Sequence, residues 1–336
     1  MKKALLGTSA LVAAGLLAGP AAAQLELVVS GDVFTEIGFV SEDDDAGTDR
    51  DYGTRNDADV NFIASGVAEN GLKYGARIIM EGAEGGDGDA GGEASINLQS
   101  GFGTIVVGED DGASSNIKFG APSAGTGILD GSFGGYVGGG SILDFDTADS
   151  GDANKIYYST QGTALDDAGV TLGLSWAPEA DERGDARGQA SRVQDSTENV
   201  FAVGASYEGS FGSTSFGVSG GYVYGDQVTG DDHNAFQIGL KAGFGAFEVG
   251  AQYVDNDTAA AEDDHTLILG AGFSQGPWNF GAQLGFGEED DQDEVSFGVG
   301  ATYAIAPGLS AQADVVIFDN DVNDGFVGIA RLAAVF

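Results

Sequence analysis

The sequence predicts an all-β fold: a sixteen-stranded antiparallel β-barrel that crosses a membrane. Apolar and polar residues alternate along segments long enough to span a bilayer, the connections alternate between short and long, and aromatic residues gather near both ends of the segments. The segment Trp278–Phe286 alternates without fault, with an apolar residue at every second position. Because successive strand side chains point to opposite faces, each such segment has one face for lipid and one for a water-filled lumen.

Composition excludes several other classes of protein. The 336 residues include no Cys, which rules out a disulfide framework, a thiolate metal site and a Cys nucleophile. Lys and Arg total 13 against 53 Asp and Glu, and the net charge of −40 argues against a nucleic-acid partner, whose phosphates need basic patches. A mean hydropathy of −0.04 argues against a bundle of membrane helices. The aromatic content of 10% is too high for a disordered acidic tail.

Residues 1–23 have the features of a secretory signal peptide. A basic start, Met1-Lys2-Lys3, precedes an apolar run over 4–18 and the small residues Ala21-Ala22-Ala23. The run is shorter than the roughly 20 apolar residues of a membrane-spanning helix. We therefore expect cleavage after Ala23, and residues 24–336 form the predicted barrel domain.

Sixteen segments carry the strand pattern, and most are near or above the roughly 9–11 residues that cross a bilayer as a tilted strand. They are residues 25–40, 57–68, 71–82, 92–100, 102–111, 153–160, 168–178, 197–209, 211–224, 233–243, 245–254, 265–274, 277–287, 294–306, 308–318 and 325–336. Turns rich in Gly, Asn and Pro alternate with long acidic loops between them, and outer-membrane barrels have short turns at one end and long loops at the other. All five Pro residues lie outside strand interiors.

The aromatic residues on the outward faces sort into two girdles. Those near the long loops are Phe39, Trp176, Tyr224, Phe236, Tyr253, Phe286 and Phe326. Those near the short turns are Tyr74, Phe244, Phe247, Phe273, Trp278, Tyr303 and Phe336. Two aromatic belts predict two membrane interfaces.

The ordered set of features resembles a known family. The chain has a signal peptide, sixteen strands, a long loop after the fifth strand with the run Asp130-Gly131-Ser132-Phe133-Gly134-Gly135, and a last strand that ends in Phe336. In these respects it resembles the sixteen-stranded general porins of Gram-negative outer membranes, especially the alphaproteobacterial kind. The resemblance implies a homotrimer, passive diffusion of small hydrophilic solutes, and insertion by the outer-membrane assembly machinery with Phe336 as part of the signal. It also implies that Phe133, Gly134 and Gly135 form the core of a constriction loop.

The loop over residues 112–152 has 41 residues, whereas structureless loops beyond about 12–15 residues are uncommon. Its apolar residues favour a loop that folds into the barrel and narrows the lumen, as in the porins it resembles. The other interpretation, a disordered surface insertion, has the support of Gly138-Gly139-Gly140. We predict the inward fold, because disordered segments lack such apolar anchors.

Charged residues predict where the channel acts on its solutes. The loop carries Asp130, Asp144, Asp146 and Asp149, and strand parity turns Lys73, Arg77 and Arg331 into the lumen. Acids on the loop that face one basic wall would place a transverse field across the passage. The alternative, that these bases merely neutralise neighbouring acids, has equal weight.

Inward parity also assigns eight acids to the lumen, which predicts a preference for cations. They are Asp32, Glu36, Asp59, Glu81, Glu208, Glu248, Glu294 and Asp314. The long loops carry dense acidic runs, such as Glu42-Asp43-Asp44-Asp45, that form a solvated surface or bind Ca²⁺. A mixed-sign patch around Arg183, Arg187 and Arg192 contacts lipopolysaccharide or pairs internally, and the sequence does not decide between the two.

Two further functions stay open at this stage. An outer-membrane barrel enzyme, such as a hydrolase, would use His233 or His265 as a general base, but no nucleophile stands next to either in sequence. A secreted acidic calcium-binding β protein would have a short Gly-Asp repeat period, which the chain lacks. The porin interpretation accounts for more of the chain than either of these, and it predicts no enzymatic activity and no cofactor.

Overall fold

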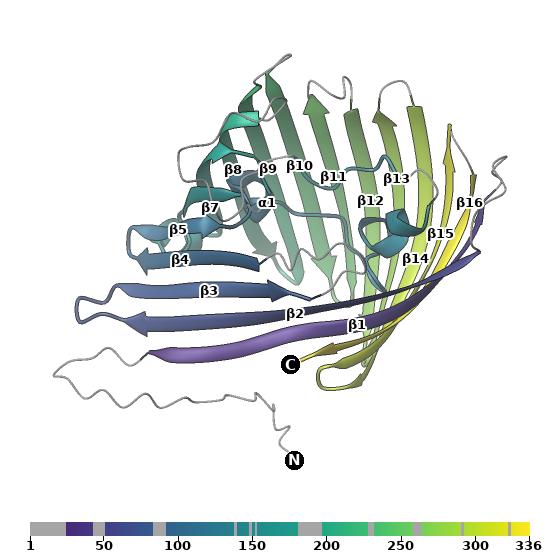
Figure 1. The fold of residues 1–336 in the computed structure, drawn as a ribbon, viewed down its shortest axis with the longest axis horizontal. Helices are drawn as coiled ribbons and strands as arrows, with labels where there is room; N and C mark the ends of the chain where they lie inside the picture. The colour runs from purple at the N-terminus through teal and green to yellow at the C-terminus, as the bar shows by residue number, and fades with distance from the viewer. Residues whose placement is uncertain are drawn as a thin grey trace.

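Sixteen strands form one closed antiparallel barrel in the computed structural model (Figure 1). The structure describes residues 25–42, 51–82, 92–137, 140–147, 150–151, 153–180, 197–227, 232–257, 264–289, 292–321 and 324–336. The predicted signal peptide lies outside these residues. Each strand pairs with its neighbours in the chain, and β1 pairs with β16 to close the ring. The prediction of an all-β, sixteen-stranded barrel is confirmed.

The strand bounds follow the predicted alternation closely. The strands are β1 (Glu26–Glu42), β2 (Tyr52–Val67), β3 (Lys73–Glu81), β4 (Gly92–Ser100), β5 (Gly103–Glu109), β6 (Asn154–Ser159), β7 (Val170–Glu179), β8 (Thr197–Phe211), β9 (Thr214–Gln227), β10 (His233–Phe244), β11 (Phe247–Asp257), β12 (Asp264–Gln275), β13 (Trp278–Glu289), β14 (Gln292–Ala306), β15 (Leu309–Asn320) and β16 (Asp324–Val335). The short helix α2 (Ala164–Asp167) lies in the turn between β6 and β7. The largest difference is at β2, which begins five residues before the predicted residue 57. There Arg55 and Asp57 still pair with β1, opposite Glu36 and Phe34.

The outward face of the barrel is apolar and exposed, as expected of a surface that meets lipid. Rings pair across neighbouring strands at both ends. Phe247 lies 5.9 Å from Phe244 and 4.7 Å from Phe273 near the short turns. Near the long loops, Phe236 lies 5.7 Å from Tyr253. Some members of each predicted girdle therefore contact one another across neighbouring strands. No helix among the described residues is long and apolar enough to cross a membrane.

The loop after β5 lies inside the ring of strands (Figure 1). We call residues 112–152 the inner loop. It contains a short helix, α1 (Ala113–Ile117), and two 3-10 helices, η1 (Ile128–Asp130) and η2 (Ser132–Tyr136). Helix α1 contacts β6 to β9, η1 contacts β13 to β15, and η2 contacts β16 and β1. The prediction that this loop folds into the barrel is confirmed.

Candidate functional site: the lumen and the inner loop

The first anchor of the inner loop holds α1 against β7 and β10. The backbone N–H of Ala113 donates to Ser175 Oγ at 2.9 Å, and Gln237 Nε2 donates to the carbonyl oxygen of Ser114 at 2.9 Å and to its Oγ at 2.8 Å. A methyl group at Gly221 would overlap Ser114, so glycine is required there for the loop to lie this close. Small lumenal residues thus make room for the helix.

The middle of the inner loop crosses the wall in extended form. The backbone N–H of Phe119 donates to Ser219 Oγ at 2.8 Å. Gln283 Nε2 donates to the carbonyl oxygens of Ala121 and Pro122, both at 3.3 Å. Its Oε1 accepts from the N–H of Leu129 at 3.0 Å. Backbone groups of the loop that lose contact with water inside the barrel are therefore hydrogen-bonded to the wall.

Two buried acids hold the loop where it turns. Asp314 Oδ2 accepts from the backbone N–H groups of Thr126 at 2.8 Å and Ile128 at 3.3 Å, and from the Thr126 hydroxyl. Glu294 accepts from Ser141 Oγ at 2.9 Å and from the N–H of Ile142 at 2.9 Å. These carboxylates are 2% and 1% exposed, so they bind the loop rather than face the water in the passage.

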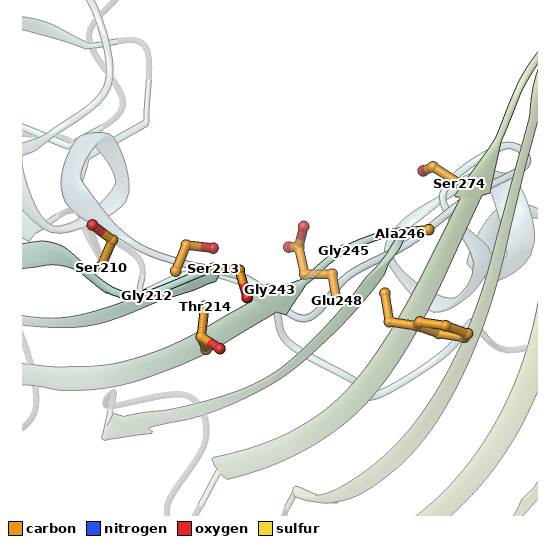
Figure 2. Close-up of a pocket in the computed structure, with 11 residues that line it drawn as sticks. Ser210, Gly212, Ser213, Thr214, Gly243, Gly245, Ala246, Glu248 and Ser274 are labelled. Carbon is orange, nitrogen blue, oxygen red and sulfur yellow. The ribbon is translucent and has the colours of Figure 1, made fainter.

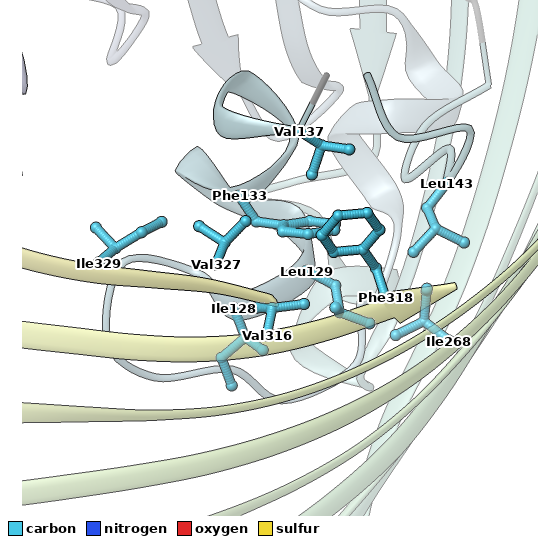
Figure 3. Packing of buried hydrophobic residues seen from close by; sticks show 10 residues of the cluster. All are labelled: Ile128, Leu129, Phe133, Val137, Leu143, Ile268, Val316, Phe318, Val327 and Ile329. Atoms are coloured by element: carbon cyan, nitrogen blue, oxygen red, sulfur yellow. The ribbon is translucent and has the colours of Figure 1, made fainter. Parts of the chain in front are cut away.

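An apolar cluster lies under η1 and η2, on the lumen side of the barrel (Figure 3). Phe133 is fully buried, and its ring lies 5.7 Å from that of Phe318. The wall contributes Ile268, Val316, Phe318, Val327 and Ile329. The expectation of a polar lumenal face is wrong at these positions, because the loop covers them and excludes water. The uninterrupted apolar run over 315–318 was the sequence signal for this cover.

The tip of the loop docks where the first and last strands meet. Arg331 of β16 pairs directly with Glu36 of β1, with Nε 2.8 Å from Glu36 Oε2. Ser132 Oγ donates to the same carboxylate at 3.0 Å, and Tyr136 OH donates to Oε1 at 3.3 Å. The Arg331 guanidinium also lies 3.8 Å over the ring of Phe34. Hence one buried ion pair joins β1, β16 and η2.

The ring of Tyr136 fills a notch made by two directly paired glycines. A methyl at Gly38 would overlap the ring, and one at Gly53 would lie 3.2 Å from it. Burial, followed by the nearby Glu36 carboxylate, raises the pKa of Tyr136 to about 12. The phenol therefore remains a hydrogen-bond donor at neutral pH.

The anchors leave one side of the wall uncovered. Among the described residues, the loop's hydrogen bonds run to β1 and to strands from β6 to β16, among them those through Glu36, Lys155, Ser175, Gln237, Asp314 and Arg331. Strands β3, β4 and β5 lie on the remaining side.

The barrel and its inner loop match a family model described as Gram-negative porin, over residues 7–323. The chain belongs to this porin family. It is accordingly a general, non-enzymatic channel protein of the Gram-negative outer membrane that works by passive diffusion.

Solved porins share the fold of this porin at low identity. A mutant of the Rh. blastica porin is 18% identical, with a TM-score of 0.67 over 92% of this chain and 100% of that one. An anion-selective porin from Comamonas acidovorans is 17% identical, with a TM-score of 0.65 over 93% and 100%. No curated protein matches the chain. At these identities the likeness shows the fold alone.

The predicted acids of the loop have different surroundings in this porin. Asp130 is exposed on the inner loop, yet the surrounding protein partly shields its carboxyl from water and so raises its pKa. The charge of Lys118 offsets part of this rise, and the charge of Asp146 adds to it. Asp146 forms an ion pair with Lys118. Asp144 Oδ2 accepts from Asn256 Nδ2 at 2.8 Å, so it also anchors the loop. Asp149 lies outside the described residues.

The predicted bases do not come together as one wall. Arg331 lies under the loop tip, with a side chain that is 13% exposed. Arg331 pairs with Glu36 of β1, and Glu36 pairs with Arg55 of β2, whereas Arg77 of β3 pairs with Ile63 of β2. Arg55 and Ile63 are eight positions apart along β2. At roughly 3.3 Å per residue, this offset is about 26 Å. Lys73 and Arg77 share the lumenal face of β3, and Arg77 lies 3.4 Å from Glu93.

Of the loop-core residues, Phe133 is central to the apolar cluster. A methyl group at Gly134 would lie 3.7 Å from Ser141 Cβ, and one at Gly135 would have open space around it. Three charged residues at the lumen were missed: Arg55, Glu93 and Lys118. Strand parity could have found Glu93 on β4. No such rule applies to Lys118, because Lys118 lies on the inner loop. Phe336 closes the barrel through backbone hydrogen bonds with Gly31 at 2.9 and 3.0 Å.

Proposed function

We propose that small hydrophilic solutes and ions pass between the inner loop and the wall of β3 to β5, and that cations pass more readily than anions. The observation that carries the proposal is the fixed loop: hydrogen bonds hold it along its length, so it narrows the lumen permanently. The passage is then lined by polar and charged side chains that replace part of a solute's hydration.

The cation preference rests on fewer acids than strand parity alone indicates. Glu36, Glu294 and Asp314 bind the loop. The acids that still support the preference are Asp32, Asp59, Glu81, Glu93, Glu208 and Glu248 on the wall, with Asp130 and Asp146 on the loop. The net charge of −40 acts in the same direction over a longer range.

A transverse field remains part of the proposal in a reduced form. Asp130 and Asp146 belong to the loop, and Lys73 and Arg77 belong to the facing wall. Ion pairs with Lys118 and Glu93 weaken the field from Asp146 and Arg77. Asp149 is included in the same proposal because of its position in the loop sequence. Arg331 is assigned instead to holding the loop tip.

The assembly state and the partners are proposed from the family. They comprise export by a signal peptide over residues 1–23, a homotrimer, contact with outer-membrane lipid and lipopolysaccharide, and insertion by the assembly machinery with Phe336 in the signal. Calcium at the acidic loops is a weaker proposal. No group of three or more His, Asp or Glu suited to a metal ion occurs among the described residues, and much of the acidic loops lies outside them.

Reversal potentials in planar bilayers under a KCl gradient test the proposal. The sign of the potential should show that K⁺ passes more readily than Cl⁻, and replacing Arg77 by Met should increase that preference. A potential of the opposite sign would refute the cation preference. Unchanged single-channel behaviour in the Arg77→Met variant would remove Arg77 from the passage.

A further inference from the structure

Lys73 differs from four other basic side chains at the lumen. Arg55, Arg77, Lys241 and Arg331 each lie within 4 Å of a carboxylate oxygen. Among the described residues, the contact of the Lys73 ammonium is a neutral one, with Gln99 Oε1 at 3.3 Å. Within the part of the chain that the structure describes, no carboxylate oxygen lies within 4 Å of this ammonium, although the chain has 53 acids and 13 bases.

The ammonium lies at a cavity of about 530 Å³ near the short-turn end of β1 to β4. The polar residues that line it are Glu26, Ser65, Lys73, Asn97 and Gln99. Directly paired residues share a face, and the pairs Glu26–Ser65, Ser65–Gly75 and Gly75–Asn97 form one row across four strands. The lumenal face of β3 therefore has no side chain at the centre of this row.

Opposite charges flank that gap. Glu26 lies two strands from β3, about 10 Å at the usual spacing between strands. Lys73 is two residues along β3 from Gly75 and pairs directly with Gln99. The amides of Asn97 and Gln99 and the hydroxyl of Ser65 offer donors and acceptors between the two charges.

We propose that this cavity binds small zwitterions, such as amino acids, with the solute carboxylate at Lys73 and its ammonium at Glu26. The inference names a solute class for the proposed channel and therefore rests on the proposed function. The acidic lumen disfavours anions but does not repel a zwitterion, because a zwitterion carries no net charge. The two charged ends of the zwitterion match the two fixed charges of the cavity.

The opposite wall provides a comparison. Near the short turns of β8 to β12 lies a cavity of about 640 Å³, lined by Ser210, Ser213, Thr214, Glu248 and Ser274 among others (Figure 2). The described residues that line it include a carboxylate and hydroxyls but no Lys or Arg. This cavity lacks the pair of opposite charges. A smaller cavity beside it, of about 160 Å³, is lined by both Lys241 and Glu208, but these two side chains already form an ion pair with each other.

The test is the reduction of single-channel KCl current by glycine in planar bilayers, with glycerol at equal concentration as a neutral control. For Lys73→Met and for Glu26→Gln, we expect the half-blocking glycine concentration to rise about two- to fivefold, as for loss of one exposed ion pair. Lys73→Arg should retain the wild-type value, and acetate or ethylamine should block less well than glycine.

The outcomes separate this inference from the proposed function. Equal glycine block in wild type and Lys73→Met, with KCl steps present in both, would overturn the zwitterion site alone. Acetate that blocks as well as glycine would also overturn it, in favour of a simple anion site. Absence of KCl steps in every variant would refute the proposed channel itself. Heat-modifiable migration on a gel confirms that each variant is folded.

Discussion

At the scale of single residues, the same side-chain types serve two roles according to whether the inner loop covers them. Glu36, Glu294 and Asp314 are lumenal by strand parity but accept hydrogen bonds from the loop. Arg331 is lumenal by parity but pairs with a fully buried carboxylate. Charge alone therefore does not identify the residues that act on passing ions.

The pair of Glu36 and Arg331 yields a stability prediction. Replacing Arg331 by Met leaves the Glu36 carboxylate buried without its cation, and removing one partner of a buried pair costs about 3–5 kcal/mol. Urea unfolding in detergent should show a loss near the lower figure, because Ser132 and Tyr136 still donate to Glu36.

The matched control for this prediction is Arg77→Met. The Arg77 side chain is 42% exposed beside Glu93, and exposed ion pairs contribute less than about 1 kcal/mol. Equal losses of stability in the two variants would show that Arg331 does not hold the loop tip.

Asp130 yields a prediction about pH. Surrounding protein atoms partly shield the Asp130 carboxyl from water and hold its pKa above the ordinary value of 3.8, so this acid becomes neutral at a higher pH than an ordinary carboxyl. The folded state binds this proton more tightly than the unfolded state. The resulting stabilisation is complete below the unfolded pKa and is lost as the pH rises through the raised folded pKa.

As the pH falls, the reversal potentials of wild type and Asp130→Asn should therefore converge before ordinary carboxyls are protonated. At neutral pH the wild type should show the stronger preference for K⁺. A difference between the two proteins that persists unchanged down to pH 3.8 would mean that the Asp130 pKa is not raised.

At the scale of elements, the notch for Tyr136 yields the next prediction. An Ala at Gly38 places a methyl group where the phenol ring lies, and overpacking of this kind costs about 1–3 kcal/mol. We expect η2 to lose its fixed position, with noisier and larger single-channel currents. Gly328→Ala is the control, because nothing lies within 4 Å of an added methyl there. Quiet, unaltered currents in Gly38→Ala would show that the notch does not fix the loop.

The strands were predictable from the sequence because lipid and water impose a period of two residues. The segment Trp278–Phe286 shows that period fully, and β13 begins at Trp278. The start of β2 was missed because residues such as Arg55 resemble loop residues until their partners on β1 are known. Such pairing depends on register, which a single strand does not show.

The site was only partly predictable for a related reason. Parity correctly turned Arg331 and Asp314 toward the lumen, but it assumes that water fills the whole interior. The loop covers one side of it, and burial of Val316 and Phe318 follows from that cover. Which wall stays open depends on contacts between residues far apart in the sequence, which local patterns do not show. Ser132 and Glu36 are 96 positions apart, and Thr126 and Asp314 are 188 positions apart.

At the scale of the whole molecule, the barrel and the loop together form an asymmetric channel. One side of the ring supports the loop, and β3 to β5 form the facing wall. The central claim is that solutes pass along that facing wall. The absence of native Cys permits a direct test, since single Cys residues can be introduced without background labelling.

The decisive measurement is current block by a water-soluble, charged thiol reagent at three single-Cys variants. Asn97→Cys lies on the wall of β4, Ser296→Cys on β14 where the native side chain is fully buried, and Ile78→Cys on the outward face of β3. We predict that the reagent reduces the single-channel current of Asn97→Cys and leaves the other two unaltered. Block at Ser296→Cys, or no block at Asn97→Cys, would contradict the placement of the passage.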